Sequence, residues 1–227
     1  MKCWFTLYDL HGNILSTTPE KEKITGYNIS DNLKLTDIIH PDDKEKFKIW
    51  LATSQFYSST IILRIIIKSG EILWVRVYAG EFKDKSICVL TVVLSKMHSF
   101  FYRIKKFFNK KTFNDFSLKV VVSKHKKDGM FVDLSGQFHQ IMNLPIQELN
   151  KSDIYQKVIH PNDRQRVYQD SHILTSSQIP EVIFRMKKAN NTYVWAKTYS
   201  SMIDKEFIYC VTIKINYFIV LINKFFK

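Results

Sequence analysis

The stretch Ile39-His40-Pro41-Asp42-Asp43 occurs twice in this chain, with one change. Ile159-His160-Pro161-Asn162-Asp163 repeats it 120 positions later. In both copies the proline suits the first position of a helix, where its missing N–H costs nothing. Acidic residues follow in the first turn, where the helix dipole favours negative charge. We therefore interpret the stretch as the start of one helix in each of two similar domains.

Positions outside this stretch repeat at nearly the same spacing. The aligned pairs are Arg64 and Arg185, Trp74 and Trp195, and Tyr78 and Tyr199, all at an offset of 121 residues, and Cys88 and Cys210 at an offset of 122. Several unrelated positions that keep nearly one offset indicate an internal repeat. Here the repeated unit is a whole domain of about 100 residues.

Both halves show the same predicted order of elements: two strands, short helices, a longer helix and three more strands. Alternating or β-branched apolar runs between turn residues mark the strands. The predicted strands are 4–10, 14–16, 60–67, 71–79 and 86–94 in the first half, and 118–123, 131–133, 180–187, 193–200 and 207–215 in the second. Thr18 is predicted as the N-cap and Pro19 as the first residue of a short helix that ends at Gly26.

This order of elements resembles the PAS domain, and in particular the PAS/PAC subgroup with its His-Pro-x-Asp, Arg and Trp signature. The residues that carry the resemblance are His40, Pro41, Asp42, Asp43, Arg64, Gly70 and Trp74 in the first copy, and His160, Pro161, Asn162, Asp163, Arg185 and Trp195 in the second. The second copy has Ala189-Asn190-Asn191 where the first has its turn glycine. Asn tolerates positive φ, so the same fold is expected there.

The resemblance implies an α+β fold with two PAS-like domains, each a five-stranded antiparallel sheet with short helices on one face. The predicted boundaries are 1–95 for the first domain, 96–116 for a basic aromatic helical linker, 117–216 for the second domain and 217–227 for a helical tail. A ligand pocket is expected between sheet and helices.

Family resemblance also bears on function, because PAS domains detect small ligands, haem, flavin or redox change, or dimerise. No nucleophile, base or paired carboxylates stand at a spacing that supports catalysis, so we expect a non-catalytic sensory and signal-transduction module. It is expected to bind a small ligand, to form a homodimer or to bind a signalling partner protein. The alternative is the sensory region of a histidine kinase or cyclase whose output domain is missing.

Candidate site residues fall into two groups. The ligand-pocket candidates are Arg64, Arg185, His172 and Trp50. For the two arginines, the alternatives are a structural role, as an ion pair or a snorkelling guanidinium, and an anion ligand in the pocket. The residues interpreted as the structural motif are His40, Pro41, Asp43, Trp74, His160, Pro161, Asp163 and Trp195. The two tryptophans are expected to pack, with contact between domains as an alternative.

No cofactor or metal site is predicted. The Asn-Cys-Arg-Phe type of helix motif that flavin photosensing in this family requires is absent, and Cys88 and Cys210 stand in predicted strands. We expect them to be buried small apolar residues with little reactivity. His172, late in the second long helix, is a better candidate for a haem ligand than the two motif histidines, but haem is not expected.

The positive charge of the chain is concentrated near its centre. Of a net charge of +13, ten Lys and Arg residues against one Asp between positions 95 and 127 supply +9. The apolar residues of the linker repeat with helical spacing, flanked by Arg103, Lys105, Lys106, Lys110 and Lys111. The interpretations are a signalling helix that packs on a sheet or a dimer mate, an amphipathic helix on an anionic membrane, and a nucleic-acid contact.

The remaining features favour a cytoplasmic protein. The three cysteines have no pairwise spacing that would indicate a disulfide framework, and no signal peptide is recognised. The apolar run 217–222 is far shorter than the roughly 18–20 residues of a membrane span. That run must be buried, and homodimerisation through the tail is one way to bury it.

Overall fold

The computed structural model describes residues 2–31, 33–54, 59–95, 120–127, 130–135, 157–172, 179–188, 190–204 and 206–215. The predicted linker 96–116 and tail 217–227 lie outside the described residues, as do residues 136–156, where the short helices of the second half are predicted. We refer to the described part of residues 2–95 as domain 1 and to that of residues 120–215 as domain 2.

Domain 1 contains five strands and three short to medium α-helices in the predicted order. Its elements are β1 (Cys3–Tyr8), β2 (Ile14–Thr17), α1 (Glu20–Thr25), the 3-10 helix η1 (Ile29–Asp31), α2 (Leu35–Ile38), α3 (Pro41–Ser54), β3 (Ser59–Ile66), β4 (Ile72–Glu81) and β5 (Ile87–Val93). Helix α3 begins at the proline, as predicted.

Domain 2 repeats this plan. Its described elements are β6 (Val120–Lys126), β7 (Phe131–Leu134), α8 (Pro161–His172), β8 (Glu181–Lys187), β9 (Tyr193–Ser201) and β10 (Phe207–Ile215). The two sheets have the corresponding strand orders β2-β1-β5-β4-β3 and β7-β6-β10-β9-β8, and all paired strands are antiparallel. The predicted fold class, α+β with two five-stranded antiparallel sheets, is confirmed.

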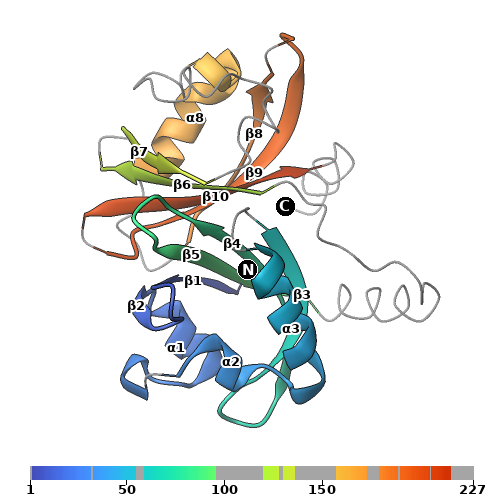
Figure 1. Cartoon of the computed structure of the whole chain (residues 1–227). Coiled ribbons are helices and arrows are strands. Elements are labelled where there is room, and N and C mark those ends of the chain that lie inside the picture. Colours follow the sequence, from blue (N-terminus) through green and yellow to red (C-terminus); the bar gives the residue numbers. More distant parts are fainter. Residues whose placement is uncertain are drawn as a thin grey trace, which may run out of the picture.

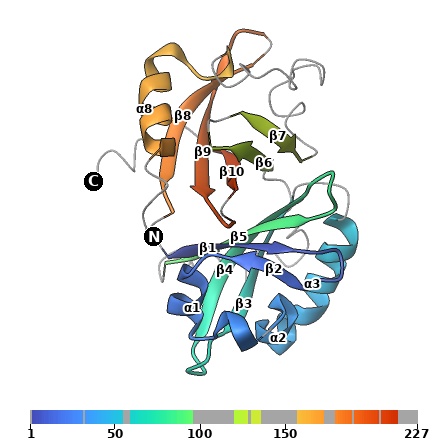
Figure 2. The same ribbon diagram turned by 90° about the vertical axis from the view of Figure 1, so that its left-hand side faces the viewer.

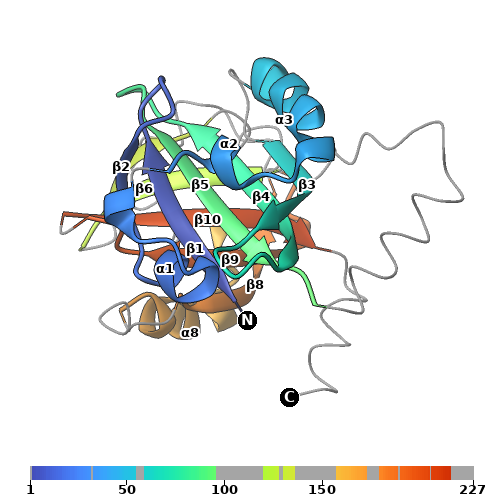
Figure 3. The same cartoon turned by 90° about the horizontal axis from the view of Figure 1, so that it is seen from below.

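The two sheets lie face to face, and the helices cover their outer faces. In Figures 1 and 2, α1, α2 and α3 lie on the side of the first sheet away from domain 2, and α8 lies on the far side of the second sheet. Figure 3, viewed from below, shows the helices of domain 1 in front of their sheet. The described molecule is therefore a sandwich of two sheets between two helical layers.

One apolar core joins the domains across this sandwich. Phe5, Tyr78 and Leu90 of domain 1 and Tyr209 and Val211 of domain 2 belong to the same buried cluster. Separate clusters lie between each sheet and its own helices. Each central strand is thus largely buried on both faces.

The predicted N-cap of α1 is wrong. The helix begins at Glu20 after Pro19, and no side chain caps it. The hydroxyl of Thr18 instead accepts a hydrogen bond from the Phe5 N–H at 3.2 Å, while the Thr18 N–H donates to the Phe5 carbonyl at 3.0 Å. Thr18 is 3% exposed, so this pairing with β1 satisfies main-chain groups that water does not reach.

Domain 2 forms the same pairing with another residue. Ser135 accepts from the Val122 N–H at 3.1 Å and donates its own N–H to the Val122 carbonyl at 2.8 Å. Phe5 and Thr18 therefore align with Val122 and Ser135 at an offset of 117 residues. The structural repeat is more extensive than the sequence comparison indicated, because this part of the two halves shares few identical residues.

The alignment of Cys88 with Cys210 is wrong by one residue. Cys88 pairs with Gly80 across β4 and β5, and the corresponding pair in domain 2 is Tyr209 with Ser201. The offset is thus 121, as for the arginines and tryptophans. Because successive side chains of a strand point to opposite faces, Cys88 faces the other domain and Cys210 faces the outer, helical side.

Candidate functional site

The repeated His-Pro-x-Asp stretch fastens the start of α3 to the edge strand β3. The Asp43 carboxylate accepts from the Arg64 main-chain N–H at 2.7 Å, from Nε at 2.9 Å and from Nη2 at 2.9 Å. The Asp42 carboxylate accepts from the same Nη2 at 3.1 Å. The Arg64 guanidinium carbon lies 5.7 Å from the Trp74 ring centre, within the range of a cation–π contact.

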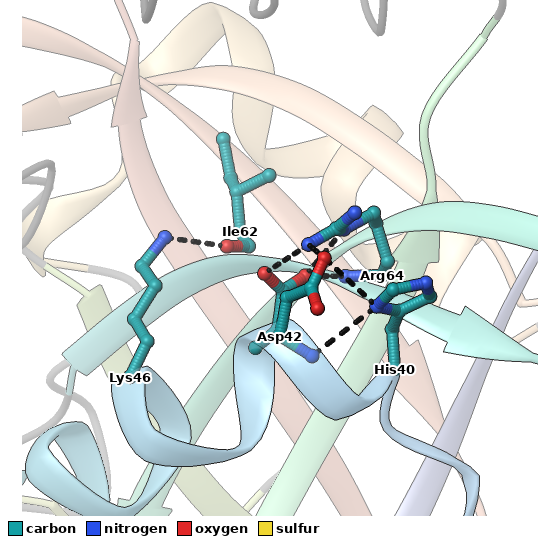
Figure 4. Close-up of polar contacts among 6 residues, drawn as sticks. His40, Asp42, Lys46, Ile62 and Arg64 are labelled. Carbon is teal, nitrogen blue, oxygen red and sulfur yellow. Dashed lines mark hydrogen bonds and ion pairs between the residues drawn. The ribbon is translucent and has the colours of Figure 1, made fainter.

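Main-chain carbonyls of β3 accept hydrogen bonds from the same helix and from the residue before it. The His40 N–H donates to the Arg64 carbonyl at 2.9 Å, and the Lys46 ammonium donates to the Ile62 carbonyl at 2.7 Å (Figure 4). The Asp42 N–H donates to His40 Nδ1 at 3.3 Å. Nδ1 must carry no proton to accept this bond. The motif histidine therefore serves the helix start, which is the structural role predicted for it.

We call the arrangement of Asp43, Arg64 and Trp74 a clamp, and domain 2 has the same one. Asp163 accepts from the Arg185 main-chain N–H at 2.8 Å, from Nε at 3.0 Å and from Nη2 at 2.9 Å. Arg185 lies 5.6 Å from the Trp195 ring centre. The His160 N–H donates to the Arg185 carbonyl at 3.0 Å, and Arg166 donates to the Ile183 carbonyl. Asn162 stands at the position of Asp42, and its N–H donates to His160 Nδ1 at 3.2 Å.

The electrostatics of the clamp favour ionised carboxylates. Burial opposes ionisation of Asp43, but the hydrogen bonds and charge of Arg64 outweigh it and lower the pKa of Asp43. The pKa of Asp163 is lowered by Arg185 in the same way, again against the effect of burial. These groups form tight ion pairs that join a helix to a strand, an arrangement suited to stability.

The four predicted pocket residues lie in different places. Arg64 and Arg185 are in the two clamps, on edge strands. Trp50 is 2% exposed in the helix-side core of domain 1, with its ring centre 5.5 Å from that of Phe47. His172 is the last residue of α8, and its side chain lies outside the described residues. The described structure thus separates the two arginines from Trp50.

A group of buried polar side chains in domain 2 was not identified from the sequence. They share the helix-facing side of the central strands β6, β9 and β10. The group, called here the polar face, comprises Ser123, His125, Thr198, Ser200, Cys210 and Thr212, all buried. At the aligned positions domain 1 has Thr6, Tyr8, Val77, Ala79, Val89 and Thr91.

Hydrogen bonds connect neighbours on the polar face. His125 Nε2 lies 2.8 Å from Ser123 Oγ, and the hydroxyls of Thr198 and Thr212 are 2.7 Å apart. The Ser200 hydroxyl and the Cys210 sulfur are 3.2 Å apart. Burial raises the pKa of Cys210 to about 11, against the opposing effect of its serine hydrogen bonds. The face therefore presents hydroxyls, an imidazole and a protonated thiol.

Alternation along each strand is the signal that could have revealed the polar face. Ser123 and His125 are two residues apart on β6, and the same spacing relates Thr198 to Ser200 and Cys210 to Thr212. Residues two apart lie on one side of a sheet. The one-residue error at Cys210 placed that cysteine on the opposite face and hid the pattern.

Two further properties concern ions and membranes. Among the described residues, no three His, Cys, Asp or Glu side chains are grouped to hold a metal ion. Within the same residues, no helix combines the length and apolar composition that a membrane span requires.

Comparison with known proteins identifies the fold of domain 2. A family model described as the PAS fold matches residues 131–213. The crystal structure of the N-terminal domain of a diguanylate cyclase with a PAS/PAC sensor from Marinobacter aquaeolei is similar at 13% sequence identity and a TM-score of 0.39, covering 43% of this chain and 99% of that chain. No curated protein matches the sequence. Residues 131–213 thus match the PAS fold, and domain 1 has the same strand order.

Proposed function

We propose that the chain is a non-catalytic sensory and signal-transduction module in which domain 2 binds a small polar ligand. The match of residues 131–213 to the PAS fold supports the sensory class. The polar face supports the assignment to domain 2, because it carries hydrogen-bonding side chains at positions where the aligned face of domain 1 has apolar ones. A ligand with several hydrogen-bonding groups fits such a surface.

Domain 1 has a different role in this proposal. Val77, Ala79 and Val89 stand where domain 2 has Thr198, Ser200 and Cys210, and the aromatic rings of Trp4 and Trp50 belong to the same core. An apolar core of this kind stabilises a fold and offers few groups that would orient a polar molecule. We assign domain 1 the role of a structural partner that covers the inner sheet face of domain 2.

The ligand is tested on the full chain. Native mass spectrometry of protein purified from its source should detect a bound small molecule. In a screen of small polar compounds, those that bind should raise the melting temperature of the protein. The double variant Thr198→Val/Ser200→Ala should weaken binding by about tenfold or more, because two hydrogen-bonding groups are lost. Thr91→Val is the matched control, since Thr91 is a buried threonine of the domain 1 sheet.

Two results would contradict this assignment. One is the absence of any bound or stabilising small molecule. The other is a ligand whose affinity falls with Thr91→Val and is unchanged in the double variant, which would place the site in domain 1.

The charge of the linker supports a second candidate function, a contact with an anionic partner. The linker 96–116 has six Lys and Arg residues against one Asp, a local charge of +5 that would favour binding to nucleic acid or anionic lipid. Lys105, Lys106, Lys110 and Lys111 changed together to Glu should abolish salt-sensitive binding to DNA or to anionic vesicles. If the unmodified chain shows no such binding at low salt, this second function fails.

A further inference from the structure

The interface between the domains has a nearly two-fold arrangement. Ser16 of β2 donates its hydroxyl to the Ile203 carbonyl at 2.7 Å. Asp133 of β7 accepts from the Lys83 N–H at 2.7 Å. Ser16 and Asp133 are aligned residues of the two domains, at an offset of 117. Their partners are nearly aligned as well, because Ile203 aligns with Phe82 at an offset of 121 and Lys83 is the next residue. Each domain thus presents its second strand to the last hairpin turn of the other, as in an isologous dimer.

The first departure from two-fold symmetry is an ion pair. Lys124 Nζ of domain 2 lies 3.0 Å from Asp84 Oδ2 of domain 1, and its side chain is 12% exposed. The rings of Phe207 and Tyr209 lie 4.2 Å and 5.8 Å from the same ammonium. Leu7 is the residue of domain 1 that aligns with Lys124. Leu7 pairs with Cys88, and Lys124 pairs with Tyr209, the residue that aligns with Cys88. The sequence aligns Asp84 with Lys205.

The second departure is a close approach of main chain. A Cβ atom at Gly80 would lie 2.6 Å from Ser135 Oγ and 2.7 Å from a methyl carbon of Val122. Glycine is therefore required where β4 passes over β6. The aligned residue of domain 2 is Ser201, which carries the side chain that this contact excludes.

The third departure is the direction of a hydrogen bond. Ser16 is a donor to the Ile203 carbonyl, whereas the aligned Asp133 is an acceptor from a main-chain N–H. An ionised carboxylate has no proton to donate. Asp133 therefore cannot replace Ser16 opposite a carbonyl oxygen.

We propose that each inner sheet face is built to accept the other domain and to reject a second copy of itself. Two copies of domain 1 would set Asp84 against Leu7, leaving the carboxylate without the lysine that pairs with it across the interface. Two copies of domain 2 would set Ser201 against Val122 and Ser135, and Asp133 against the Ile203 carbonyl. Specificity of this kind comes from penalties on wrong pairs as well as from contacts in the right one. The partner that fits domain 2 is domain 1, from the same chain or from a second copy by exchange.

Substitutions in the full chain can reproduce each wrong pair. Lys124→Leu sets Asp84 against a leucine, as two copies of domain 1 would, and Gly80→Ser reproduces the steric contact of two copies of domain 2. Hydrogen exchange of the Lys83 amide reports opening of the interface, because this N–H bonds across it. The Val77 amide of the central strand β4 reports unfolding of domain 1 itself.

Both variants should raise the exchange rate of Lys83 by about tenfold or more relative to Val77. The matched control is Lys85→Leu, because Lys85 lies on the same turn but pairs with Glu81 of its own hairpin. The control should change the rate less than about twofold. A rate as slow as in the unmodified chain for either test variant, or an equal rise in the control, would overturn the proposal.

Exchange of charges gives a second measurement that does not depend on the single variants folding. Asp84→Lys and Lys124→Asp should each open the interface, and the double variant should return Lys83 exchange to within about threefold of the unmodified chain. Recovery in the double variant, even from unfolded single variants, supports the assignment. A double variant with the combined defects of the two single variants contradicts it.

Discussion

The main-chain N–H of Arg64 and its guanidinium bind the same carboxylate, that of Asp43. One side chain therefore fixes both the first turn of α3 and the backbone of β3. The same double contact joins Arg185 to Asp163 in domain 2. This relationship explains why an acid, an arginine and a tryptophan recur at constant spacing in both halves of the chain.

Asp43→Ala should lower the free energy of unfolding of domain 1 by about 2–3 kcal/mol, because Arg64 loses its partner at a largely buried site. Asp42→Ala is the matched control. Asp42 is 67% exposed and contributes one contact to Arg64, so its loss should cost less than about 1 kcal/mol. Urea unfolding followed by tryptophan fluorescence measures both. Equal costs for the two variants would show that the clamp is not organised around Asp43.

Acid should remove the contribution of the clamp. Burial alone would raise the pKa values of Asp43 and Asp163, but the hydrogen bonds and charges of Arg64 and Arg185 outweigh this effect. Both pKa values are therefore below the ordinary 3.8 in the folded protein. A lowered pKa contributes stability above the unfolded value, and this contribution is lost as the pH falls through the folded value. The difference in urea midpoint between the unmodified chain and Asp43→Ala/Asp163→Ala should be constant above about pH 5 and shrink below about pH 4. A difference that grows on acidification would contradict the assignment.

Thr18→Val should destabilise domain 1 by about 1–2 kcal/mol, because the buried Phe5 N–H loses its acceptor while side-chain volume is nearly kept. The exposed Thr36 of α2 gives the control, Thr36→Val. Thermal unfolding measures both. If Thr18→Ala and Thr18→Ser were equally stable, the hydroxyl would have no such role.

The three cysteines should resist modification in the folded protein. All are buried, and burial raises the pKa of Cys3 and of Cys210 to about 11 and that of Cys88 in the same direction. At pH 8 a thiol of this kind is ionised in only about one molecule per thousand. A thiol reagent should therefore label them slowly in buffer and quickly in urea, as mass spectrometry would show. Rapid labelling of Cys88 in buffer would mean that the interface between the domains opens readily.

The sequence predicted those features of the fold that depend on local chemistry. The proline, the acids of the first turn and the arginine 21 or 22 residues after the second acid are recognisable because each has a structural purpose. The strand order followed from the resemblance that these residues supported. The structural ion pair of Arg64 is one of the alternatives that the sequence supports, although the sequence does not identify Asp43 as the partner.

Features that depend on the register of a strand were harder to predict. Two cysteines in aligned strands suggested an offset of 122, but Cys88 lies on the inner face and Cys210 on the outer face. A single residue in a turn decides between these faces. The polar face and the interface between the domains both depend on that choice. Thr18 was likewise a plausible helix cap, and only the proximity of β1 directs its hydroxyl elsewhere.

The clamps also protect the molecule from association through strand edges. A sheet edge with free N–H and carbonyl groups is a template on which another chain can add a strand, which is a route to aggregation. On β3, the Ile62 carbonyl and both main-chain groups of Arg64 are already bonded to α3 or to His40, the residue before it. On β8, the Ile183 carbonyl and both main-chain groups of Arg185 are bonded in the same way. Loss of Asp43 or Asp163 would therefore expose a site for strand addition, so such variants should form fibrils or aggregates more readily than their loss of stability alone would produce.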